Sequence, residues 1–323
     1  MRYFLIYNLS FFLFLYSNSI AQQVSDSIPL DKAITIYKES LKKNPGSIVI
    51  AYNLAYSEYI TGHYNDAIKL CRDFEKKTSL FQADFHIVHA ASLDRLHRTS
   101  VALELMGKAT QTFPGKPDAW YQLAFYQYKY HEFDKALPAL YRAINLQPLN
   151  PQAHYLLCAI WYENNNYAAC LFPMFYGMLT ETVNINCQSN LAFCEAIFNR
   201  RHDEIQVPSY DSRIYIYSAD QIFQQYEPEH LMTNFINSWD PDKFVSQANG
   251  YLSMNSQTTD TVSLTKNFYS PFFIKLLNSG NAEPAFYYML RCIDHPQIKQ
   301  WIKNHPAKME KFADWLEKNL PGK

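Results

Sequence analysis

The chain has 323 residues and carries 29 basic against 30 acidic side chains, a balance that offers no positively charged surface for nucleic acid. Aromatic residues make up 16% of the chain, with 25 tyrosines and 22 phenylalanines, whereas glycine occurs only 8 times. Few glycines and many large side chains argue against a turn-rich β-sandwich and favour packed helices.

The N-terminal segment has the features of a secretory signal peptide. Arg2 precedes a largely apolar run over residues 3–16, and residues 19–21 read Ser-Ile-Ala, a small-x-small pattern that suits signal peptidase. The run is shorter than the roughly 20 residues of a membrane span, and an uncleaved anchor is the alternative. We therefore expect residues 1–21 to be removed. The mature chain, starting at Gln22, would be secreted or periplasmic, with no later membrane span.

Small residues recur along the chain at an almost constant interval. Two ladders have steps of 34 or 35 residues, and the one longer step falls in the same interval of both, which places an extra residue in a loop near residues 76–82. Because two antiparallel helices approach closely only where both carry small side chains, the ladders predict successive helical hairpins. The members are Ala33, Ala67, Ala102, Ala136 and Cys170 in one ladder, and Ala55, Ala90, Ala124, Cys158 and Ala192 in the other.

The clearest repeat runs from Pro117 to Asn150. Its large, small and terminating residues include Trp120, Leu123, Ala124, Ala136, Leu140, Ala143 and Pro148. These residues resemble the tetratricopeptide repeat, a helix–turn–helix unit of 34 residues. The resemblance covers about 170 residues in phase and implies an all-α fold, a right-handed α-solenoid of about four hairpins followed by a helical C-terminal region.

The period also divides the chain into segments. We expect a solenoid over residues 22–206, with a half unit at about 29–47, full units at 48–82, 83–116, 117–150 and 151–184, and a partial unit from 185. Residues 207–217 are interpreted as a linker. Residues 218–323 are expected to be helical, and they include a degenerate hairpin over 272–290 and two short amphipathic helices over 296–320 that could cap the array. The sequence leaves open whether this region docks on the array.

The tetratricopeptide resemblance implies that the first helix of each unit lines a concave groove. Carrying over the fifth, ninth and twelfth positions of the units gives a stripe of eight aromatic residues: Tyr52, Tyr56, Tyr59, Tyr121, Phe125, Tyr128, Tyr155 and Tyr162. Rigid aromatic faces with polar tips suit an extended peptide and also suit sugar rings. Part of the stripe is generic for the family. Lysines that would grip a terminal carboxylate are missing from the fifth positions, which disfavours capture of a chaperone C-terminus.

The leading hypothesis is therefore an exported scaffold that binds a protein or peptide partner, in support of envelope complex assembly. The alternative is a glycan-binding module that uses the same groove, and a third reading is an enzyme with a site at the junction of the array and the C-terminal region. Motifs for catalysis or for a cofactor are missing from the sequence, so we expect no enzymatic activity and no cofactor.

Two pairs of residues allow either a chemical role, as a disulfide or a metal site, or a role in packing alone. Cys158 and Cys170 occupy facing small positions, and close helix approach could join them in a disulfide, although cysteine is also a small apolar filler. His86 and His89 lie three residues apart on one helix, a spacing compatible with a metal, but the repeat frame favours packing positions for both.

Overall fold

A computed structural model of the chain describes residues 29–77, 81–181, 187–199, 239–255 and 264–321. The expected signal peptide, the linker at 207–217 and the first part of the C-terminal region lie outside these ranges. Within them every regular element is a helix, which confirms the all-α prediction. None of these helices combines the length and the apolar character that a membrane crossing requires.

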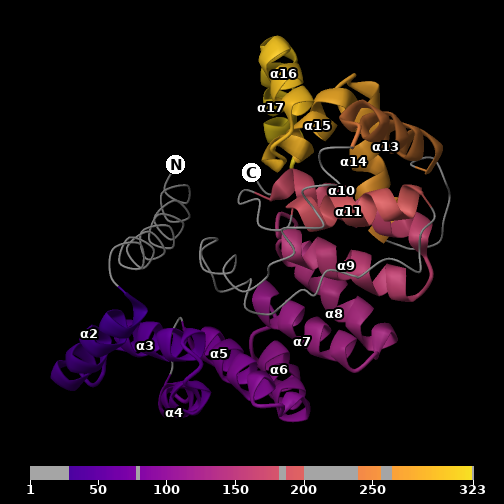
Figure 1. Cartoon of the computed structure of the whole chain (residues 1–323). Coiled ribbons are helices and arrows are strands. Elements are labelled where there is room, and N and C mark those ends of the chain that lie inside the picture. Colours follow the sequence, from indigo (N-terminus) through magenta and orange to yellow (C-terminus); the bar gives the residue numbers. More distant parts are fainter. Residues whose placement is uncertain (1–28, 78–80, 182–186, 200–238, 256–263, 322–323) are drawn as a thin grey trace, which may run out of the picture. The chain divides into compact units, whose positions relative to one another are not determined.

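The chain divides into two compact units, of which the first ends at Tyr126 and the second begins at Gln127, within α7 (Pro117–Lys129). In the first unit α3 packs against α4, and α5 packs against both α4 and α6 (Figure 1). The described helices before α7 are α2 (Leu30–Lys43), α3 (Ile48–Ile60), α4 (Tyr64–Phe74), α5 (Gln82–Arg95) and α6 (Thr99–Thr112).

The second unit continues the hairpins and adds the C-terminal helices. Its array part consists of α8 (Phe133–Leu146), α9 (Pro151–Glu163), α10 (Tyr167–Thr180) and α11 (Cys187–Phe198). Its C-terminal part consists of α13 (Pro241–Asn255), the π-helical turn η4 (Thr265–Tyr269), α14 (Ser270–Asn278), α15 (Ala282–Met289), the 3₁₀ turn η5 (Leu290–Cys292), α16 (Pro296–Asn304) and α17 (Pro306–Asn319).

The small-residue ladders lie where helices cross. Nine of their ten members are exposed by 4% or less, and Ala192 is partly exposed. Because a larger side chain at these positions would hold the helices apart, the ladder explains the hairpins directly. The longest connection between consecutive helices of the first unit joins Phe74 to Gln82, where the sequence predicts the extra residue.

Each hairpin of the array turns through one residue in the left-handed backbone region. In α3–α4 this residue is Gly62, and the amide of His63 donates to the carbonyl of Glu58 at 2.8 Å, which caps the end of the first helix. Equivalent residues recur at His97, His131 and Asn165, each five residues before a small ladder residue. Gly280 has the same backbone conformation and stands five residues before the buried Ala285, so α14–α15 forms the hairpin that the sequence predicts.

The C-terminal hairpin docks on α10. Three ring contacts join them: Phe172 with Phe273 at 5.7 Å, Tyr176 with Phe272 at 5.0 Å, and Phe175 with Phe286 at 5.3 Å between centroids. Aromatic pairs at these separations stabilise a contact beyond the area that they bury. Within the second unit, the described C-terminal helices therefore dock on the array, which the sequence alone leaves open.

A disulfide between Cys187 and Cys292 ties α11 to η5, with 6.2 Å between the α-carbons. The candidate bridge between Cys158 and Cys170 is not formed. Both of these residues are buried free cysteines whose thiols lie within hydrogen-bonding reach of each other. Burial, followed by the neighbouring Cys170, raises the pKa of the Cys158 thiol. They serve as the small apolar residues of the α9–α10 crossing.

Candidate functional site

The eight predicted groove residues separate into two sets. Tyr52, Tyr56, Tyr128 and Tyr162 are partly exposed, whereas Tyr59, Tyr121, Phe125 and Tyr155 are buried, with exposed fractions of 2%, 1%, 6% and 0%. The shared repeat position therefore does not decide exposure. What each aromatic ring packs against decides it.

Tyr155 shows the difference most clearly. Its ring lies directly against Gly177, where a β-carbon would collide with it, and its hydroxyl donates to Oε2 of the buried Glu181 at 2.8 Å. Tyr155 thus joins α9 to α10 and its C-terminal cap. The structure uses this residue for packing within the second unit and does not place it as an open face for a partner.

Tyr59, Tyr121 and Phe125 are likewise packed inside the first unit. The rings of Tyr121 and Phe125 are stacked with 6.4 Å between centroids and 16° between planes. Tyr59 lies beside Tyr64, at 5.9 Å. At exposed fractions of 6% or less, these three rings contribute to the core of the unit.

Three partly exposed aromatic residues on and beside α3 contact one another: Tyr52, Tyr56 and Phe81, which we call the α3 aromatic face. Tyr52 and Tyr56 stand one helical turn apart with stacked rings 6.2 Å apart, and Phe81 lies 5.2 Å from Tyr52. Beneath them Phe85, which is fully buried, meets Tyr52 edge-on at 5.7 Å. Phe85 supports the ring of Tyr52, against which Tyr56 and Phe81 pack in turn.

Two carboxylates lie near one end of this face. Asp84 lies in the first turn of α5, and the Lys116 ammonium donates to both of its carboxylate oxygens at 3.1 Å. Burial raises the pKa of Asp118, at the start of α7, to about 6, with Lys116 lowering it and Asp84 raising it further. Burial also raises the pKa of Tyr52, and the same two carboxylates add to that shift. The face therefore ends in negative charge.

Sequence reasoning missed this acidic end. Asp84 and Asp118 stand 34 residues apart, at the same position of two units, so a search of the repeat frame for charges would have paired them. Each one alone looks like an ordinary acidic residue in the first turn of a helix.

In the second unit Tyr128 and Tyr162 are partly exposed but closely accompanied. Tyr128 lies 5.9 Å from Phe133, and burial, with Glu163 as the next cause, raises its pKa to about 12. Tyr162 contacts Tyr167 at 5.1 Å and Phe193 at 5.4 Å. Each ring thus covers part of its neighbour.

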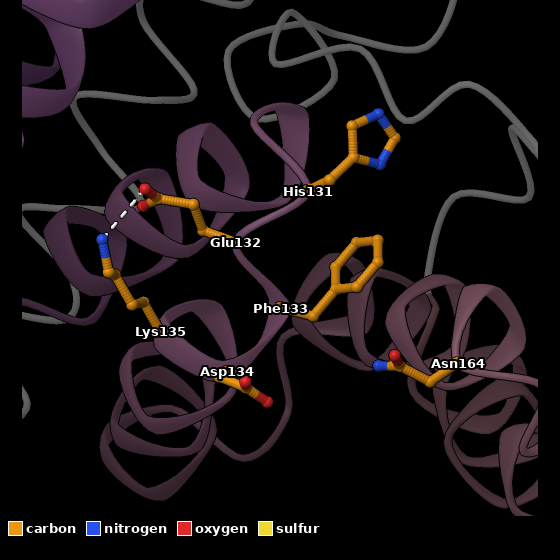
Figure 2. Close-up of a pocket in the computed structure, with 6 residues that line it drawn as sticks. All are labelled: His131, Glu132, Phe133, Asp134, Lys135 and Asn164. Atoms are coloured by element: carbon orange, nitrogen blue, oxygen red, sulfur yellow. Dashed lines mark hydrogen bonds and ion pairs between the residues drawn. The ribbon is translucent and has the colours of Figure 1, made fainter.

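A shallow hollow of about 250 Å³ lies near Tyr128, where the turn before α8 faces the end of α9 (Figure 2). Its lining mixes charges of both signs, and Lys135 is already bonded to Glu132 at 2.9 Å. Such a lining favours no single class of ligand. The six residues are His131, Glu132, Phe133, Asp134, Lys135 and Asn164.

His86 and His89 have the packing role that the repeat frame favours. Nδ1 of His86 bonds the carbonyl of Gln82 at 2.9 Å, and Nδ1 of His89 bonds Glu75 at 3.0 Å. Among the described residues, no three histidine, cysteine or acidic side chains gather in a geometry that could hold a metal.

Where α9 meets the C-terminal helices, His154 is fully buried among aromatic rings. Its Nε2–H donates to the carbonyl of Pro148 at 2.8 Å, and the Tyr269 hydroxyl donates to Nδ1 at 2.5 Å. Burial lowers the pKa of this histidine to about 4, so it is neutral near pH 7. Both ring nitrogens are occupied by the fold, which gives this histidine a structural role.

Hairpins of 34-residue period, with small residues at each crossing and a left-handed turn between the helices, define an α-helical repeat fold that resembles the tetratricopeptide repeat. No family model and no curated protein matches the chain.

Solved structures with similar helical arrays include MamA, at 20% identity and a TM-score of 0.40 over 52% of this chain and 91% of that one. A second is MamA from residue 41 onward of Desulfovibrio magneticus RS-1, at 14% identity and 0.39, over 59% and 96%. A third is YrrB, described as a TPR protein with an unusual peptide-binding site, at 15% and 0.37, over 51% and 84%.

Proposed function

We propose that this chain is a protein-interaction scaffold and that its α3 aromatic face binds an extended segment of a partner polypeptide. The observation that carries the proposal is the stacked, partly exposed pair of Tyr52 and Tyr56, supported from below by Phe85. Rigid aromatic side chains with polar tips contribute large contact areas at a low entropic cost, which is why they dominate protein interfaces.

The acidic end of the face favours a particular kind of segment. Asp84 and Asp118 share one neighbouring ammonium, that of Lys116, so their combined charge remains negative when both are ionised. A partner segment with a basic residue at one end and apolar residues beyond it would match both the carboxylates and the rings.

We also propose that the chain acts after export, in the cell envelope or outside the cell. The apolar segment before Gln22 supports this, and so does the disulfide between Cys187 and Cys292, since such bonds form and persist in oxidising compartments. Fractionation of the native cell and N-terminal sequencing test the proposal. We expect a mature chain that starts at Gln22, and a cytoplasmic chain that retains residue 1 would contradict it.

The test of binding replaces the exposed rings. We expect Tyr52→Ala with Tyr56→Ala to reduce crosslinked partner capture in a native envelope preparation by about tenfold, because two interface aromatics are removed. Tyr130→Ala is the matched control, since Tyr130 is 45% exposed and lies outside the face. Alanine at Tyr121, Phe125 or Tyr155 would be uninformative, because emptying such buried sites costs about 3–5 kcal/mol of stability.

Circular dichroism should show the same helicity for the double variant, the control and the original chain. Capture that is unchanged in the double variant would refute the role of the α3 aromatic face. If no protein is captured by any of them but a defined polysaccharide binds on a glycan array, the face is a glycan site and the scaffold proposal fails.

A further inference from the structure

A second hollow, of about 510 Å³, opens among α13, α15 and α16 of the C-terminal region. Its volume falls within the range of pockets that hold small ligands or side chains. It combines two carboxylates, two polar side chains, one valine and two aromatic rings. The lining consists of Asp242, Val245, Ser246, Asn249, Glu283, Tyr287 and Trp301.

The electrostatic field in this hollow is negative. The hydroxyl of Tyr287 donates to Oδ1 of Asp242, a neutral donor that leaves the charge of this carboxylate uncompensated by that bond. Burial raises the pKa of Tyr287, and the neighbouring carboxylates Asp242, Glu283 and Asp240 raise it further. Three carboxylates beside one phenol repel an anion and attract a cation.

The aromatic wall is rigid. The ring of Trp301 lies 3.9 Å from that of Tyr287 with only 4° between the planes, and His305 stacks on Trp301 at 4.4 Å. Because Tyr287 and His305 already stack on Trp301, a sugar ring has no face left to stack on. The part of the ring system that stays accessible to a positive charge is the part over which the Lys308 ammonium lies.

A lysine of the chain itself already places a cation beside this wall. The ammonium of Lys308 lies 2.8 Å from Oε2 of Glu283 and 5.5 Å from the centroid of Trp301. Lys308 is half exposed, so it reaches the hollow from its rim. A primary ammonium thus already pairs with one of the two carboxylates beside the indole. The second carboxylate, Asp242, offers the same chemistry on the other side.

We propose that this hollow binds a primary ammonium group, as a lysine side chain of a partner polypeptide carries it, between Asp242 and Trp301. The site is separate from the α3 aromatic face, and neither proposal depends on the other. Lys308 acts as an internal competitor, because it neutralises Glu283 and contributes positive charge at the rim.

The probe is Nα-acetyl-lysine methylamide, and the signal is the indole N–H resonance of Trp301 in the intact chain, assigned with Trp301→Phe. We expect a saturable shift of this resonance by the probe and none by its Nε-acetylated analogue, which has lost the charge. Asp242→Asn should weaken binding by about tenfold, because it removes the main counter-charge. Lys308→Met should strengthen binding several-fold.

Asp314→Asn is the control for the loss of one carboxylate, since Asp314 is exposed on α17 and outside the lining. It should leave the affinity unchanged. The opposite signs expected for Asp242→Asn and Lys308→Met separate a binding role from a loss of folding, which would weaken binding in both. Equal shifts by the acetylated analogue, tighter binding of the corresponding arginine compound, or unchanged affinity in Asp242→Asn would each overturn the proposal.

Discussion

The second helices of the hairpins share one register but bury very different surfaces. In α6 the buried residues form a single stripe of four, Ala102, Met106, Ala109 and Thr110. In α10 every residue from Ala169 to Leu179 is buried. The outer face of α10 carries the C-terminal helices and η4, which contact it directly.

The sequences of the two helices already differ in the way that this burial requires. Glu104 and Lys108 of α6 form an ion pair at 2.6 Å on the exposed side, whereas α10 contains no charged residue at all. A helix that is apolar all round is buried all round. The comparison teaches that the repeat period specifies the hairpin, while the outward positions specify whether a hairpin faces solvent or carries a further layer.

The largest expected effect contrasts equivalent positions of these helices. Phe172→Ala on α10 should lower the free energy of unfolding by about 3–5 kcal/mol, because Phe172 is 2% exposed and contacts Phe273. Glu104→Ala, 68 residues earlier and exposed, should change it by less than about 0.5 kcal/mol. Urea unfolding followed by circular dichroism measures both. Equal losses would show that α10 is not covered as described.

Removal of the disulfide tests how firmly the C-terminal layer is held. Cys187→Ser with Cys292→Ser should cost about 2–4 kcal/mol of stability, since the bond closes a loop of 105 residues in sequence. Cys158→Ser with Cys170→Ser is not an equivalent control, because it places hydroxyls at a buried crossing. Reduction of the original chain with dithiothreitol is the better comparison, and an unchanged urea midpoint after reduction would contradict a stabilising role.

The buried histidine predicts a pH dependence of the second unit. Because the pKa of His154 is about 4 in the folded chain and about 6.5 in an unfolded one, the unfolded state binds more protons below pH 6.5. Stability is therefore full above pH 6.5 and is lost as the pH falls towards 4, by about 3 kcal/mol from this group. Urea midpoints at pH 7 and pH 4.5 measure the loss. His154→Gln should show a smaller loss over the same interval, and an equal loss would assign the effect to other groups.

The smallest effect concerns the turns that the two regions share. His97→Gly should stabilise the chain by about 0.5–1 kcal/mol, because only glycine adopts a φ of 58° without a steric cost. Gly62→Ala, at the equivalent turn of the preceding hairpin, should destabilise it by a similar amount. Thermal melting of both variants at one pH measures the two changes in stability. Shifts of the same sign would show that the backbone conformation does not govern these positions.

The spacing of small residues in the sequence was sufficient to predict the hairpins. The spacing of residues such as Ala67 and Ala102 placed the crossings and the turns, because both depend only on local geometry that repeats. The hairpin with Gly280 followed from the same spacing of turn and small residue, and the final helices followed from their prolines and amphipathic pattern.

The sites could not be predicted in the same way. Tyr52 and Tyr155 hold the same repeat position, but exposure depends on neighbours such as Gly177 that lie on other helices. The partner of Cys187 is 105 residues away and becomes apparent only once the C-terminal region is docked. The hollow lined by Asp242, Glu283 and Trp301 depends on three helices whose relative placement no periodicity encodes.

The bond between Cys187 and Cys292 also determines what a protease can achieve. A single cut anywhere between these two residues would leave both pieces covalently joined, and the molecule would keep its full mass on a non-reducing gel. The same sample would separate into two fragments once reduced. A chain built in this way can lose the continuity of its backbone in a protease-rich environment and still remain one molecule.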